Sequence, residues 1–211
     1  MFVAFEGGEG VGKSTQVAAL AALLRERGLD VVETHEPGDT IIGPDVRRLV
    51  LGHASAGLSP QAEALLYAAD RAEHVAAVVR PALERGAVVI TDRYVDSSLA
   101  FQGAGRPLDY AMVQQVNAWA TGGLVPDLTV LLDLDPAAGL RRAGEPDRLE
   151  VEPLEFHARV RAKFLELAAA HPERYVVVDA AADPGRVHAA VAAAVLARLG
   201  VRGGRAGTAR A

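Results

Sequence analysis

The chain has 211 residues, half of them hydrophobic, and a formal net charge of −5. This length can bury one sizeable core, and the mildly acidic balance argues against a nucleic-acid partner. The chain has no cysteine, which excludes disulfides and thiolate chemistry, and no apolar run near the ~20 residues that span a bilayer, so we expect a cytoplasmic protein without a membrane partner.

Short apolar runs alternate with segments of helical periodicity. In chain order, the predicted elements are a strand at 2–5, a helix at 13–27, a strand at 31–34, a helix at 44–51, a long helix from 60 that breaks near Pro81, a strand at 87–92, a helix at 110–120, a strand at 127–134, helices at 136–142 and 154–170, a strand at 175–179 and a helix at 184–199. Nearly continuous apolar strands alternating with helices predict an α/β fold, with a five-stranded parallel sheet flanked by helices on both faces. We expect one domain over 1–199, a short lid at about 142–152 where the sequence turns irregular, and a disordered tail at 200–211.

The stretch "GGEGVGKST" between the first strand and the first helix has the glycine, lysine and serine spacing of a phosphate-binding loop. Its glycines let backbone N–H groups point at phosphate oxygens, Lys13 reaches the outer phosphates, and the Ser14 hydroxyl binds Mg²⁺. The loop therefore predicts a P-loop NTPase fold. The predicted nucleotide-binding residues, which the resemblance described below makes ATP-binding, are Gly7, Gly8, Glu9, Gly10, Val11, Gly12, Lys13, Ser14 and Thr15.

An acid at the end of the third strand is the candidate partner of that serine. Asp92 in "VVITDRY" follows a buried strand, where ligands of open parallel sheets sit, so we expect it to hold Mg²⁺ through water. Asp133 in "LLDL" is the rival. Arg93 favours Asp92, because a site that moves a phosphoryl group uses both a metal and a fixed planar cation. The alternative is that Asp92 only caps the strand or pairs with Arg93.

Three further arginines, Arg47, Arg71 and Arg148, lie in candidate site segments. An arginine on an amphipathic helix is more often a solvated residue than a ligand. Arg71 stands out because Tyr67 lies four residues earlier on the same helical face, so an aromatic ring and a guanidinium could grip a base together. The alternative is that Tyr67 belongs to the core.

Several motifs in order resemble those of the bacterial thymidylate kinases, which move the terminal phosphate of ATP to dTMP. They are the phosphate loop, "EPG" (36–38), "LLYAADRAEH" (65–74), "DRYVDSSLAFQG" (92–103), "PDLTVLLDL" (126–134) and "DRLE" (147–150), and the resemblance extends to about Leu199. It implies transfer rather than hydrolysis, ATP and dTMP as substrates, Mg²⁺ as cofactor and a homodimer.

The resemblance also implies roles for individual residues. Lys13, Arg93 and the lid arginines Arg142 and Arg148 would be catalytic, with Arg148 as the lid cation that reaches the transferred phosphate or Arg141 and Arg142 sharing that role. The acid of the phosphate loop would face the 3′-hydroxyl of the acceptor. The implied dTMP-binding residues are Glu9, Arg47, Tyr67, Arg71, Arg93, Ser97, Ser98, Phe101 and Gln102.

The sequence departs from the family pattern at His35 and Asp39, where an arginine and a glycine are usual, and at Phe101, which replaces a tyrosine near the sugar. An additional acid near phosphates is unfavourable unless it faces solvent or metal, which leaves the role of this loop open. Two alternative functions remain, a kinase of another nucleoside monophosphate and a switch ATPase. A switch would not need the acceptor-side residues.

Overall fold

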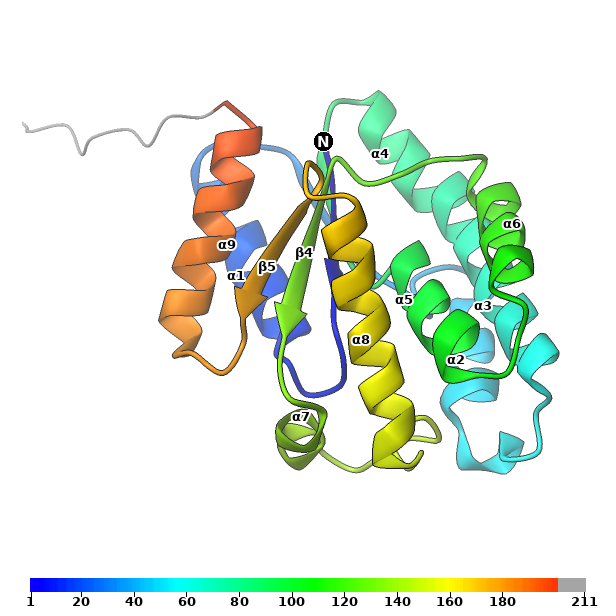
Figure 1. Ribbon diagram of the computed structural model, residues 1–211. Helices are drawn as coiled ribbons and strands as arrows, with labels where there is room; N and C mark the ends of the chain where they lie inside the picture. The colour runs from blue at the N-terminus through cyan, green and yellow to red at the C-terminus, as the bar shows by residue number, and fades with distance from the viewer. Residues whose placement is uncertain (201–211) are drawn as a thin grey trace, which may run out of the picture.

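The computed structural model describes residues 1–200, and a parallel five-stranded sheet lies at its centre (Figure 1). The strands are β1 (Phe2–Glu6), β2 (Val31–His35), β3 (Val88–Asp92), β4 (Leu128–Asp133) and β5 (Tyr175–Asp179), in the order β2-β3-β1-β4-β5. The three central strands are buried almost throughout, as expected for strands covered on both faces. The predicted fold class is confirmed, and the predicted strand bounds agree to within one or two residues.

The helices are α1 (Lys13–Glu26), α2 (Gly43–Leu51), α3 (Pro60–His74), α4 (Arg80–Glu84), α5 (Val95–Ala100), α6 (Tyr110–Thr121), α7 (Pro136–Arg142), α8 (Leu154–Ala170) and α9 (Pro184–Arg198). Because side chains alternate along a strand, Val3 and Phe5 pack with α1 and α9, whereas Phe2 and Ala4 face the opposite side. Helices α2, α3, α5, α6 and α8 contribute to the core on that opposite side. The sheet is thus covered on both faces, with α1 and α9 together on one of them (Figure 1).

The long predicted helix begins and breaks where its sequence indicates. Ser59 caps α3, accepting a hydrogen bond from the backbone N–H of Ala62 at 3.3 Å. Before Pro81 the helix passes through a π-helical segment, Val75–Val79, and continues as α4. The proline ring is incompatible with an uninterrupted α-helical ladder, which accounts for this break.

One helical region was not predicted. Helix α5 and the π-helical segment Phe101–Gly105 follow β3 almost at once, where the motif "DSSLAFQG" had no assigned structure. A single 3₁₀ turn, His53–Ser55, also follows α2. The predicted disordered tail lies, apart from Gly200, outside the described residues.

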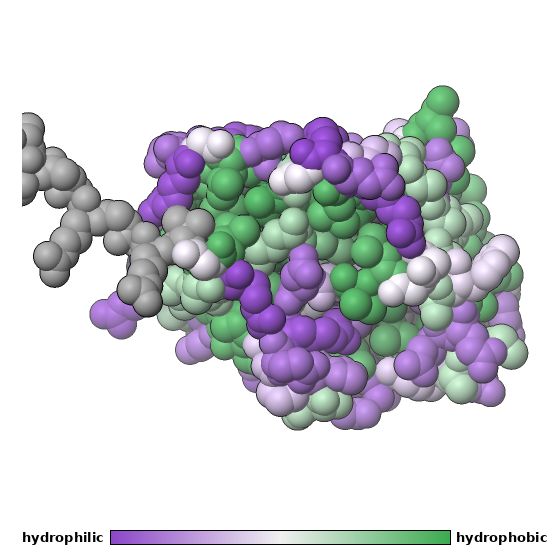
Figure 2. Space-filling model, turned by 90° about the horizontal axis from the view of Figure 1, so that it is seen from above, coloured by the Kyte–Doolittle hydropathy of each residue, from purple (hydrophilic) through white to green (hydrophobic). Residues whose placement is uncertain are grey.

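The carboxyl ends of the strands converge on one edge of the sheet, at the bottom of Figure 1. Asp92 pairs in register with Phe5 on one side and His35 on the other, so the ends of β1, β2 and β3 are level. The view from above looks at the amino ends of the strands, where apolar and charged residues are interspersed (Figure 2). Within residues 1–200, no helix is long and apolar enough to cross a membrane.

Candidate active site

The phosphate loop connects β1 to α1 in a conformation that requires its glycines. Gly10 has a φ of 64°, and a Cβ there would lie 2.0 Å from the carbonyl oxygen of Gly139 in α7. Gly12, with a φ of 89°, precedes the first residue of α1, so the helix N-terminus opens into the loop. The Lys13 ammonium donates to the carbonyl oxygens of Gly7 and Gly8, at 3.3 and 2.7 Å. The loop therefore presents backbone N–H groups and a lysine together, which is an anion-binding arrangement.

Ser14 and Asp92, the two predicted metal ligands, are hydrogen-bonded to each other. The Ser14 hydroxyl donates to the Asp92 carboxylate at 2.8 Å. The rival acid, Asp133, is held by Arg161 through two hydrogen bonds of 2.7 and 2.9 Å. A hydroxyl and a carboxylate beside a phosphate loop fit Mg²⁺, which uses few protein oxygens and completes its shell with phosphate and water.

Arg93 lies between the phosphate loop and the predicted acceptor residues. Its guanidinium donates to the Glu9 carboxylate at 2.7 Å and to the Gly7 carbonyl oxygen at 3.2 Å, and it stacks 5.0 Å above the centre of the Phe101 ring. Burial raises the pKa of Glu9, but Arg93 and Lys13 outweigh it and hold that pKa below its ordinary value. Burial, followed by the charge of Arg93, lowers the pKa of Lys13. These clustered cations would be further stabilised by an anion.

All nine predicted acceptor-side residues line one cavity of about 160 Å³. A second cavity of about 600 Å³ runs along the phosphate loop and is lined by Lys13, Ser14 and Asp92 among others. Glu9, Glu36, Arg47 and Arg93 line both cavities. A ligand in either one would therefore meet the same acids and the same arginines.

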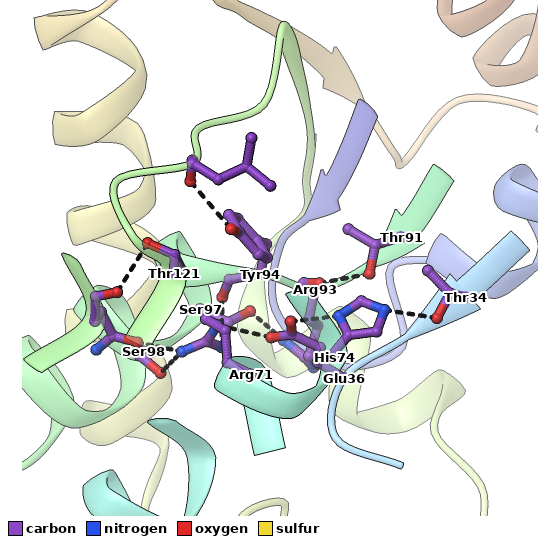
Figure 3. A network of polar contacts seen from close by, with 12 residues as sticks. Thr34, Glu36, Arg71, His74, Thr91, Arg93, Tyr94, Ser97, Ser98 and Thr121 are labelled. Atoms are coloured by element: carbon purple, nitrogen blue, oxygen red, sulfur yellow. Dashed lines mark hydrogen bonds and ion pairs between the residues drawn. The ribbon is translucent and has the colours of Figure 1, made fainter. Parts of the chain in front are cut away.

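The floor of the acceptor cavity is a buried polar network around Arg71 (Figure 3). Arg71 is 1% exposed and donates to Glu36 at 2.7 Å, to the Ser98 hydroxyl at 2.8 Å, to the Tyr94 carbonyl oxygen at 2.9 Å and to Asn117. A guanidinium has five N–H donors, so within the described residues one remains for a ligand.

The same network contains two residues that sequence reasoning missed. Glu36 also bonds His74 at 2.7 Å, and the other ring nitrogen of His74 contacts the Thr34 hydroxyl at 2.7 Å. Figure 3 shows His74 bridging Glu36 and Thr34, so that β2 and α3 are tied together beneath the cavity. The "EPG" motif could have indicated Glu36. His74 lies at the end of "LLYAADRAEH", and its role required the contact with Glu36 to be seen.

The structure does not bring Arg148 to the phosphate loop, contrary to its expected position as the lid cation. Arg148 is 6% exposed and donates to the Val50 carbonyl oxygen at 2.8 and 2.7 Å and to Glu63 at 2.6 Å. Glu63 also accepts hydrogen bonds from Gln102 and Arg106. A buried acid with these partners draws the arginine into the protein and away from the phosphates.

Arg142, the other predicted lid arginine, does line the phosphate-loop cavity. It is exposed and donates to the Ala180 carbonyl oxygen at 2.9 Å, while Arg141 is exposed and does not line that cavity. The lid segment also reaches the other cavity, where Asp147, Leu149 and Glu150 form part of the wall. Of the lid arginines, Arg142 is therefore the one near the phosphate loop.

The two departures in "HEPGDT" lie at the surface. His35 and Asp39 are exposed, and both line the phosphate-loop cavity. Solvent therefore reaches the Asp39 carboxylate, which reduces its repulsion of a phosphate chain. Phe101 is buried beneath Arg93 and packs against Phe156 and Phe164.

Comparison with known proteins gives consistent matches over almost the whole chain. A family model described as thymidylate kinase matches residues 5–191. A thymidylate kinase from Clavibacter sepedonicus is 59% identical, over 85% of this chain and 87% of that protein. One from Deinococcus radiodurans is 53% identical, over 94% and 97%. A crystal structure of thymidylate kinase from Ehrlichia chaffeensis aligns with a TM-score of 0.77 and 33% identity, covering 92% of this chain and 97% of that one.

Proposed function

The chain belongs to the thymidylate kinase family, and we propose that it transfers the γ-phosphate of ATP to dTMP, giving dTDP and ADP for dTTP synthesis. The observation that carries this proposal is the pair of cavities that share Glu9, Arg47 and Arg93. Two nucleotides bound in these cavities would direct their phosphates at the same arginines. Such alignment of donor and acceptor is the main requirement of phosphoryl transfer.

On the ATP side, the loop N–H groups and the N-terminus of α1 would bind the phosphates, and Lys13 would move from the Gly7 and Gly8 carbonyl oxygens to the outer phosphates. Ser14 and Asp92 would hold Mg²⁺. The metal would neutralise charge on the phosphate oxygens. The exposed guanidinium of Arg142 would close over the transferred group.

On the acceptor side, Tyr67 would stack on thymine, and the remaining N–H donor of Arg71 would bond a base oxygen. Arg93, assisted by Arg47, would bind the dTMP phosphate, and Glu9 would face the 3′-hydroxyl. Ser97, Ser98, Phe101 and Gln102 would complete the wall around the base and sugar.

The reaction itself needs no strong general base, because the acceptor oxygen of dTMP is already an anion. The side chains therefore act by alignment and by neutralising charge, through Lys13, Arg93 and Arg142. Arg148 would act indirectly, since its bonds to Glu63 and Val50 hold the lid segment against α2 and α3. A held lid keeps water from the transferred phosphate and so limits hydrolysis.

We also propose a homodimer formed through α3 and α6. Leu65 on α3, Met112 and Trp119 on α6 are exposed apolar residues, and Trp119 is 86% exposed. An apolar groove of about 400 Å³ lies between the two helices and is lined by Leu65 and Met112. An apolar surface of this kind is typical of subunit contacts.

We further propose one kinase domain over 1–199, located in the cytoplasm with its nucleotide substrates.

A panel of nucleoside monophosphates tests the proposed function. Steady-state ADP formation would be measured with dTMP, dUMP, dCMP, dGMP and UMP, with Lys13→Ala as the inactive control. We expect the highest kcat/KM with dTMP. A higher value with another monophosphate would favour a different nucleotide kinase. Slow ADP release that is the same with every acceptor would favour a switch ATPase.

A further inference from the structure

The backbone of Arg93 has an unusual conformation that other groups must stabilise. Its φ of 72° makes it the only non-glycine residue with positive φ among residues 1–200, a conformation that residues with a Cβ rarely adopt. Its N–H donates to the Phe5 carbonyl oxygen at 2.9 Å, and its carbonyl oxygen accepts from the Thr91 hydroxyl at 2.9 Å. The next N–H, that of Tyr94, donates to Oε1 of Glu6 at 2.9 Å. Among residues 1–200, Glu6 is thus the one acidic side chain that accepts a backbone N–H of this turn.

The same carboxyl group also contacts the residue that holds the Arg93 side chain. The Ser97 hydroxyl donates to Oε2 of Glu6 at 2.6 Å, and the Ser97 N–H donates to Oε1 at 3.1 Å. The guanidinium of Arg93 in turn donates to the Ser97 hydroxyl oxygen at 3.2 Å. One side chain therefore restrains both the backbone and the guanidinium of Arg93.

Glu6 has no contact with the two cavities themselves. It is 0% exposed, it ends β1 immediately before the phosphate loop, and it lines neither the acceptor cavity nor the phosphate-loop cavity. Burying a carboxyl group is unfavourable unless its oxygens are hydrogen-bonded. Here they accept two N–H groups and one hydroxyl, all from the turn and helix that follow Arg93.

We propose that Glu6 is a positioning residue, which holds the Arg93 guanidinium where the acceptor phosphate binds. This proposal rests on the proposed function, because it assumes that Arg93 binds that phosphate. A carboxyl group suits the role, since Oε1 accepts two N–H groups while Oε2 contacts the Ser97 hydroxyl. Glutamine keeps these three contacts, with its amide donating to Ser97, whereas alanine removes all of them.

A double-mutant cycle between Glu6 and Arg93 tests the proposal. Glu6→Ala, Arg93→Ala and the double variant would be assayed for kcat and KM with ATP and dTMP, after circular dichroism has confirmed folding. Misplacing a catalytic group by about 1 Å can cost on the order of 10²-fold, so we expect that loss of kcat for Glu6→Ala. In the Arg93→Ala background, Glu6→Ala should cause no further loss, because its target is absent. Glu6→Gln should keep most of the wild-type kcat.

The matched control is Asp96→Asn. Asp96, a buried acid on α5, accepts a hydrogen bond from the Tyr175 hydroxyl and makes no hydrogen bond with Arg93 or Ser97 among the described residues. This variant loosens the same helix and should leave kcat near wild type. If Glu6→Ala does not fold, Glu6→Asp replaces it in the cycle, since the shorter side chain withdraws the same group from Tyr94 and Ser97.

Four results would overturn the proposal. The first is an unchanged kcat in Glu6→Ala, and the second is a loss of kcat from Glu6→Ala that is the same in the wild-type and Arg93→Ala backgrounds. The third is a loss of kcat in Glu6→Gln as large as that in Glu6→Ala, and the fourth is a loss of that size in Asp96→Asn. Failure of the proposed function is recognised separately, because it would appear in the wild-type protein as an absence of transfer to dTMP.

Discussion

Arg148→Ala separates a structural role of the lid arginine from a catalytic one. The substitution removes three hydrogen bonds, two to the Val50 carbonyl oxygen and one to Glu63. Removing one partner of a buried ion pair costs about 3–5 kcal/mol, because the other partner stays buried. Glu63 keeps Gln102 and Arg106 as donors, so we expect the lower end of this range.

Thermal unfolding measures this loss. For a domain of this size each kcal/mol lowers Tm by about 2–4 °C, so a loss of about 3 kcal/mol corresponds to a decrease of roughly 6–12 °C. When it is assayed well below its own lowered Tm, Arg148→Ala should keep a kcat near that of the wild type. Its KM for dTMP should rise, because the neighbouring Asp147, Leu149 and Glu150 line the acceptor cavity.

Arg142→Ala is the matched variant with the opposite expectation. Arg142 is exposed, so its loss should change Tm little and lower kcat. An unchanged Tm together with a large loss of kcat in Arg148→Ala would refute the structural role. It would mean that Arg148 leaves Glu63 and reaches the transferred phosphate during turnover.

Three further predictions concern the site. Lys13→Ala should abolish transfer while circular dichroism remains that of the folded protein, and normal activity would contradict the assignment of the phosphate loop. Arg93→Ala should lower kcat by about 10²–10³-fold, because Arg93 acts at the reacting phosphate. At saturating dTMP this loss should exceed that of Arg71→Ala. A larger loss in Arg71→Ala would mean that the two roles are exchanged. Burial, together with the charge of Asp96, raises the pKa of Glu6 from 4.5 to about 8, whereas Ser97, Arg93 and the Tyr94 N–H lower it. The native state thus keeps a proton that the unfolded chain releases, and stability falls as pH rises through this window. Denaturant unfolding at several pH values should therefore show that Glu6→Gln becomes more stable relative to wild type as pH rises from 4.5 to about 8. A difference in free energy of unfolding that does not change with pH would refute the raised pKa.

The fold could be predicted closely because each element has a local cause. Apolar runs specify the strands, Ser59 and Pro60 specify the start of α3, and the glycine spacing specifies the phosphate loop. Helix α5 was missed because its six residues are too few for a helical periodicity to be recognised. Its N-terminus also lacks a side-chain cap of its own and uses Glu6 from β1, a partner 88 residues away from Tyr94.

The site was predicted to the extent that motifs specify it. Most of the residues taken from motifs line the two cavities, although Gly7 and Gly8 do not, because the carboxyl ends of the parallel strands bring their loops together. Arg148 did not follow its motif, because its position depends on Glu63, a buried acid on a helix distant in sequence. Long-range ion pairs of this kind leave no periodic pattern in the sequence. The same holds for the contact between Glu36 and His74.

The fate of the γ-phosphate is the central question. The enzyme would be incubated with dTMP, magnesium and ATP labelled in its γ-phosphate, and the labelled products would be separated. We predict that the label appears in dTDP, that it equals the ADP formed, and that little label is released as inorganic phosphate. Label found mainly in inorganic phosphate, at a rate unaffected by dTMP, would contradict the assignment of this site to phosphoryl transfer.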